Sequence, residues 1–176
     1  MKKFFAVLLF LFSFSQAFSS HIVGGEVAYI YIGPGSQPNT SRYTVMLRLF
    51  TECGQICGGS TGVACPPENP LIGVFNNVAP YSRVATITLA LIANPQINLS
   101  YYPPCLDNRP EVCYKVNTYS AQVELANTSS GYRLAYQSCC RAASLNVSST
   151  ASTTSGVPGA TYEATMPGTN ILPTGQ

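Results

Sequence analysis

The sequence is poor in the residues that most enzymes use for catalysis. Its 176 residues include no tryptophan, a single histidine, His21, and a single aspartate, Asp107. A Ser-His-Asp triad would have to use these two residues, and nothing else in the sequence suggests one. The glutamates are scattered without paired spacing, and no phosphate-binding or dinucleotide-binding glycine motif occurs. The sequence therefore predicts a protein that is not an enzyme and that has no cofactor.

Charge is also scarce, since only 9% of the residues are charged. Without the two lysines at positions 2 and 3, the nine basic residues fall to seven, which equals the seven acidic residues. No cluster of basic residues that could bind nucleic acid or an anionic membrane surface is present. The remaining surface should be neutral and polar, as in many exported β proteins, and we expect no nucleic-acid partner.

The amino-terminal residues have the pattern of a secretory signal peptide. Two lysines precede an apolar run over Phe4–Phe14, and the small residues Ser15 and Ala17 suit cleavage after Ala17, with cleavage after Ser19 as the alternative. The run is shorter than the ~20 residues that a membrane-spanning helix needs. We therefore expect residues 1–17 to be removed. The mature protein should be extracellular or on the outer cell surface, without a transmembrane span.

Apolar and polar residues alternate with a period of two in several segments, which is typical of β strands. In the segment 84–91 we expect Ile87, Leu89 and Leu91 to face the core. The segment 26–32 is apolar on both faces and should be a more buried strand. The segments are residues 26–32, 43–49, 84–91, 121–125 and 131–136.

These strands, separated by turn motifs, predict an all-β fold, an antiparallel β-sandwich of immunoglobulin-like architecture with disulfides, over residues 18–150. Residues 151–176 should form a loop rich in Ser, Thr and Gly, a final strand near 160–166 and a truncated linker. We expect the chain to be the front part of a longer protein.

Seven cysteines in an exported chain indicate disulfides rather than a metal site. The chain has one histidine and no Cys-x-x-Cys pair, so no metal ligands are predicted. Cys57 and Cys65 bracket a short segment and should close on each other. The cysteines are Cys53, Cys57, Cys65, Cys105, Cys113, Cys139 and Cys140.

The adjacent Cys139 and Cys140 are too close in the chain to bond each other without strain. If the strand alternation continues, Cys53 and Cys140 both face the core, and we expect a bond between them unless a bulge substitutes Cys139. Cys105 and Cys113 should close a short loop. Cys139 would then be a free thiol with a possible redox role, or one loop pairing differs, or its partner lies in a missing part of the chain.

Eleven tyrosines also allow a sugar-binding interpretation. Tyrosine is common in strands, so most should pack in the sandwich with the hydroxyl at the surface. Tyr101 and Tyr102, which precede two prolines, are the expected exposed pair and the candidate ligand contacts.

Several segments resemble the amino-terminal region of very large surface proteins of Bacteroidetes, many of which end in the gliding-motility-associated sorting domain of type IX secretion. The segments are SHIVGGEVAY (20–29), YTVMLRLFTEC (43–53), PPCLDNRPEVC (103–113), GYRLAYQSCCR (131–141) and GATYEATMPG (159–168). The resemblance implies an outer-surface or secreted protein with an adhesin-like architecture, and it brings no catalytic residues.

Together these observations predict a non-catalytic structural or adhesive module at the front of a secreted or cell-surface bacterial protein. Its partner is unknown, and surface polysaccharide or other cell-surface proteins are the candidates. The alternative is a carbohydrate-binding or carbohydrate-active module that uses surface tyrosines.

Overall fold

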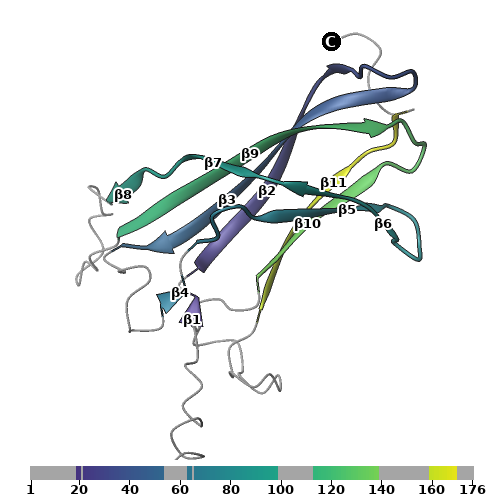
Figure 1. Ribbon diagram of the computed structural model, residues 1–176. Helices are drawn as coiled ribbons and strands as arrows, with labels where there is room; N and C mark the ends of the chain where they lie inside the picture. The colour runs from purple at the N-terminus through teal and green to yellow at the C-terminus, as the bar shows by residue number, and fades with distance from the viewer. Residues whose placement is uncertain are drawn as a thin grey trace, which may run out of the picture.

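The protein is a sandwich of two antiparallel β-sheets (Figure 1). The computed structural model describes residues 19–20, 22–53, 63–64, 66–98, 113–138 and 159–169. Most of these residues are in strands, and they contain no α-helix. The predicted all-β antiparallel sandwich is therefore confirmed. No helix within the described ranges is long and apolar enough to cross a membrane.

The first sheet, called here the long sheet, is built around two strands of 13 and 14 residues. Strand β3 pairs with β9 along its whole length, from Thr40 opposite Ala126 to Glu52 opposite Tyr114. The strand order is β2-β3-β9-β7, and β8 also pairs with β9. The strands are β2 (Ile22–Pro34), β3 (Thr40–Glu52), β7 (Ala90–Ala93), β8 (Gln96–Asn98) and β9 (Cys113–Ala126).

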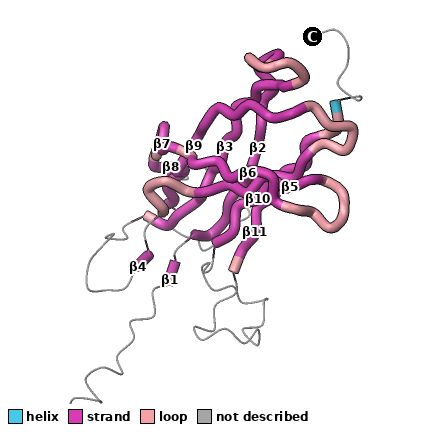
Figure 2. The backbone as a smooth tube through the Cα atoms, turned by 45° about the vertical axis from the view of Figure 1, so that its right-hand side comes forward, coloured by secondary structure: helices cyan, strands magenta, loops and turns pink. Residues whose placement is uncertain are grey.

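The second sheet, called here the short sheet, has the strand order β11-β10-β5-β6 (Figure 2). The strand expected near residues 160–166 is present as β11 and pairs with β10 along its full length. Apart from the two sheets, β1 (Ser19–Ser20) and β4 (Val63–Ala64) form a short parallel pair. The strands of the short sheet are β5 (Leu71–Asn76), β6 (Arg83–Thr88), β10 (Tyr132–Ser138) and β11 (Ala160–Met166).

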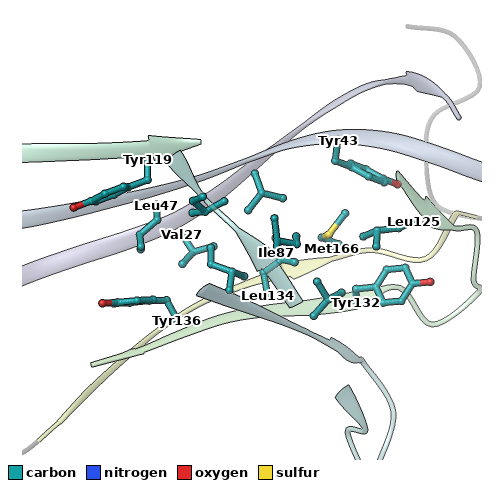
Figure 3. Packing of buried hydrophobic residues seen from close by; sticks show 14 of the residues in the cluster. Val27, Tyr43, Leu47, Ile87, Tyr119, Leu125, Tyr132, Leu134, Tyr136 and Met166 are labelled. Atoms are coloured by element: carbon teal, nitrogen blue, oxygen red, sulfur yellow. The ribbon is translucent and has the colours of Figure 1, made fainter. Parts of the chain in front are cut away.

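The core lies between the two sheets and follows from the alternation of the sequence (Figure 3). Every second side chain of β3 from Tyr43 to Leu49 is buried, because successive side chains of a strand point to opposite faces. From the short sheet, Leu134, Tyr136 and Met166 complete the same cluster. The alternation predicted for residues 43–49 and 131–136 is therefore confirmed.

The chain crosses from the short sheet to the long sheet in the middle of the segment expected to be one strand over 84–91. The segment is divided into β6 and β7, which belong to different sheets. Leu89, between them, is fully buried, and its backbone N–H donates to the carbonyl of Pro70 (2.9 Å). Ile87 is buried as expected, but Leu91 is 47% exposed because it lies past the crossing, so that part of the prediction is wrong.

Strand β2 is an edge strand of the long sheet, not the buried strand expected for residues 26–32. Val27 is buried, whereas Ile30, Tyr31 and Ile32 are exposed. Strand β2 also lies near β11 of the other sheet, because the Tyr29 hydroxyl donates to the Thr165 carbonyl (3.2 Å). A segment that is apolar on both faces is therefore an edge strand here. Apolar side chains on the two faces of a strand do not require a neighbouring strand on each side of it.

The connection between β9 and β10 carries the chain back to the short sheet and is held by a tyrosine. The Tyr132 hydroxyl donates to the carbonyl of Ala126, six residues upstream (2.8 Å). Immunoglobulin-type sandwiches have a similar tyrosine corner at the start of a strand. Gly131 precedes this tyrosine with φ of +69°, a left-handed conformation that suits glycine.

Candidate functional site

A disulfide joins Cys53 to Cys113 at one end of the long sheet, with the Cα atoms 5.4 Å apart. Cys53 directly follows β3, and Cys113 begins β9. The backbone N–H of Cys53 also donates to the carbonyl of Cys113 (3.3 Å). The bond therefore connects the ends of two neighbouring strands within one sheet.

This bond shows that both pairings expected for these residues, Cys53 with Cys140 and Cys105 with Cys113, are wrong. The reason is the strand register, which places Glu52 opposite Tyr114 and so brings the next residues of the two strands together. Alternation alone indicates which face a cysteine occupies but not which strand lies beside it. The other predicted site residues lie outside the described part of the chain: Cys57, Cys65, Tyr101, Tyr102, Cys105, Cys139 and Cys140.

A second local feature is the turn between β2 and β3, which a single carboxylate on β9 holds in place. Glu124 accepts hydrogen bonds from the backbone N–H groups of Ser36 and Gln37, both at 2.9 Å, and from the hydroxyls of Ser36 (2.9 Å) and Thr40 (2.5 Å). These donors, the Ser36 backbone first, lower the pKa of Glu124 to about 2. The carboxylate is thus charged at neutral pH and acts as an anchor for the turn.

The outer face of the short sheet contains a groove of about 220 Å³. Its floor is made of small residues, because Gly73 of β5 lies directly beside Ala135 of β10. Ile72 and Val74 point into the core, so Gly73 must face outward. The hollow exists because two adjacent strands carry almost no side chain at this point.

Apolar side chains on either side of Gly73 along β5, Leu71 and Phe75, also line this groove. Leu71 is 55% exposed. The Phe75 ring leans back over Gly73, and a Cβ placed on that glycine would lie only 2.5 Å from Cε2 of the ring. An alanine there would therefore displace the ring, so the glycine is needed for this position of Phe75.

Polar side chains line the remaining wall of the groove. Arg83 and Thr86 come from β6, and Gln137 comes from β10. Within the described ranges, none of the three side chains makes a hydrogen bond or an ion pair. Three polar groups of different chemistry are therefore available to a ligand.

The neighbouring Arg133 is already engaged. It lies opposite Phe75 on β10, forms an ion pair with Glu163 (3.7 Å), and places its guanidinium 4.9 Å from the ring centre of Tyr81. Arg83 lies opposite Phe75 on the other side and has no acidic neighbour in the part of the chain that the structure describes. The two arginines beside Phe75 are thus in different electrostatic states.

Another hollow, of about 240 Å³, lies near the disulfide and is mainly apolar. Phe50 and Tyr114 meet edge to face there, with ring centres 6.1 Å apart, next to Val23 and Gly24. It offers no charged side chain among its described lining residues. The groove on the short sheet therefore provides the more specific chemistry.

The sequence analysis did not identify this groove. Gly73, Arg83 and Gln137 are separated by ten to about sixty positions, and no motif connects them. One available signal was the glycine inside the apolar segment 71–75, because a glycine within a strand often marks a close approach of a ligand or another backbone. Among the described residues, no group of three or more His, Cys, Asp or Glu side chains could hold a metal ion.

Comparisons with protein-family models, with curated proteins and with solved structures found no match for this chain. The functional argument therefore rests on the sandwich, its edges and its groove.

Proposed function

We propose that this chain is a non-catalytic extracellular module with a structural or adhesive role at the front of a secreted or cell-surface bacterial protein. The signal-peptide pattern and the resemblance to surface proteins of gliding Bacteroidetes motivate this proposal. The Cys53–Cys113 disulfide supports it, since such bonds persist mainly in oxidising compartments outside the cytosol.

The observation that carries the proposal is the apolar character of both edges of the long sheet. On β2, Ile30 is 55% exposed and Ile32 is 44% exposed. On β7, at the opposite edge, Leu91 and Ile92 are exposed by 47% and 62%. Exposed apolar edge strands invite contact with another chain, and most soluble proteins protect them with charge. Edges of this kind suit a module that packs against neighbouring domains or surface partners.

Adhesion can be tested with beads that carry the full chain under oxidising conditions. The beads should attach to surfaces coated with bacterial cells or with outer-surface polysaccharide. The double variant Ile30→Lys and Ile92→Lys should reduce attachment several-fold, because it places charge on both edges. Val84→Lys is the matched control, since Val84 is 48% exposed on β6 of the other sheet. Equal attachment by wild type, double variant and uncoated beads would refute the adhesive role.

A second candidate function is carbohydrate binding, which the groove on the short sheet favours. The groove combines an aromatic ring with a cation, a hydroxyl and an amide on one open sheet face. Small ligand sites of this kind pair an apolar surface with a few polar groups that set orientation. Tyr81, which is 49% exposed, lies next to this face through its contact with Arg133.

A further inference from the structure

We propose that the groove on the outer face of the short sheet binds one uronic-acid unit of an acidic polysaccharide. This inference rests on the carbohydrate-binding candidate above and specifies its ligand. It concerns a surface that the apolar edges of the long sheet do not share, so the two proposals can fail separately.

The size of the groove restricts the ligand to a single ring. Its volume of about 220 Å³ is below the roughly 300–1,000 Å³ that is typical of pockets for drug-sized molecules. The Phe75 ring covers Gly73, and the small side chain of Ala135 beside it leaves room for a flat ring to lie against this floor. The Phe75 ring and Leu71 supply apolar surface for the C–H groups of a sugar ring.

The charge of the groove selects an acidic ligand. Arg83 is the charged group that lines it, and no described lining residue is acidic. The nearest carboxylate on this face, Glu163 of β11, is paired with Arg133. The other two described arginines already have partners outside the groove: Arg48 is paired with Glu26 (2.6 Å), and Arg42 donates from Nε to the carbonyl of Pro34 (3.1 Å).

Arg83 therefore has its guanidinium available to a ligand carboxylate. A guanidinium binds a carboxylate through two parallel N–H···O bonds, which fixes the orientation of the ligand as well as its charge. A uronic acid carries a carboxylate directly on its ring, so one ligand unit can reach Arg83 while its ring lies against Phe75.

The other polar groups of the groove fit the hydroxyls of a sugar. Thr86 lies directly across from Gly73 on β6, and Gln137 lies two residues beyond Ala135 on β10. A threonine hydroxyl and a glutamine amide each donate and accept hydrogen bonds, as sugar hydroxyls do. The ring would thus have polar partners from the strands on both sides of β5.

Calorimetric titration of the full, oxidised chain can test this inference with a matched pair of probes. The probes are trigalacturonate and its fully methyl-esterified form, which has the same rings without the charge. We expect trigalacturonate to bind at least about tenfold more tightly, because its carboxylates can form charge-assisted hydrogen bonds with Arg83 that the methyl esters cannot form. Added salt should weaken this binding, since the groove is open to solvent.

Two variants assign the binding to the groove. Arg83→Gln should remove the preference for the acidic probe, and Gly73→Ala should weaken binding of both probes because the added methyl group displaces the Phe75 ring. Arg42→Gln, on the outer face of the other sheet, is the control and should bind like wild type. Circular dichroism of each variant checks that the fold is intact.

Several outcomes would overturn the inference. These are no binding of trigalacturonate, equal binding of the two probes, or an unchanged preference in Arg83→Gln. Equal or tighter binding of a triglutamate peptide would also overturn it, because the groove would then be a site for acidic peptides. None of these results would affect attachment of coated beads through the edges of the long sheet, so the adhesive role would be judged by its own assay.

Discussion

The hydroxyl of Tyr132 offers a clean test of how the two sheets are connected. Its ring is buried, with 7% exposure, and burial raises the pKa of Tyr132 above its ordinary value. The hydroxyl donates to the carbonyl of Ala126 (2.8 Å), the last residue of β9. The substitution Tyr132→Phe removes this single oxygen and leaves the packed ring in place.

The expected cost follows from the net value of one hydrogen bond. A neutral hydrogen bond in a folded protein contributes about 0.5–1.5 kcal/mol to the free energy of unfolding. Ala126 is exposed, so water can solvate its carbonyl when the tyrosine hydroxyl is removed. We therefore expect Tyr132→Phe to lower the free energy of unfolding by about 1 kcal/mol, which lowers Tm by about 2–4 °C for a protein of this size.

Tyr119→Phe is the matched control, because it makes the same chemical change at a more deeply buried ring. Tyr119 is only 1% exposed, and burial raises its pKa to about 12. Its hydroxyl has no hydrogen-bond partner among the residues that the structure describes. The free energy of unfolding should therefore change by less than about 0.5 kcal/mol.

Urea unfolding of the oxidised protein, followed by far-ultraviolet circular dichroism, measures both variants on one scale. Tryptophan fluorescence cannot serve, since the chain has no tryptophan. Equal stability of Tyr132→Phe and wild type would refute the stabilising role of the corner. An equal loss in the two variants would show that the oxygen atoms act through general packing and not through the bond to Ala126.

Three further predictions concern the turn, the left-handed glycine and the disulfide. Folding lowers the pKa of Glu124 from 4.5 to about 2, so the stabilising effect of its carboxylate is present at neutral pH and is lost as the pH falls from 4.5 towards 2. The difference in urea midpoint between wild type and Glu124→Gln should therefore narrow over this pH range. A difference that stays constant would contradict the role of the carboxylate as an anchor. Gly131→Ala should lower the free energy of unfolding by more than about 1 kcal/mol, since alanine disfavours a φ of +69°; urea titration measures it, and an unchanged midpoint would argue against that conformation. After cleavage at glutamate without reduction, mass spectrometry should find the peptide that contains Cys113 joined to the peptide that begins at Cys53. A link between the Cys113 peptide and the peptide that contains Cys105 would show that the assigned bond is wrong.

The sequence alone was sufficient to predict the fold class and much of the core. Alternation at residues 43–49 and 131–136 identified side chains that are buried between the sheets, and the strand near 160–166 was located correctly. These successes have one cause. A strand that is half buried must alternate apolar and polar residues, so its inward face can be read without knowing its neighbours.

Strand neighbours, in contrast, were decided by the tertiary structure. Cys53 bonds Cys113 because β3 and β9 lie side by side in one register. Leu91 is exposed because the chain changes sheets at Leu89, although the alternation continues through both positions. A period of two contains no information about which strand is adjacent or where a sheet ends.

The groove depends on the same missing information. Gly73, Ala135 and Arg83 belong to three strands, and each is an ordinary residue in its own segment. Only the pairing of β5 with both β6 and β10 places two small side chains together and an unpaired arginine beside them. The alternation of each strand determined the two-sheet core, whereas the lateral order of the strands, set by long-range hydrogen bonding and packing, decided the edges, the disulfide and the candidate binding site.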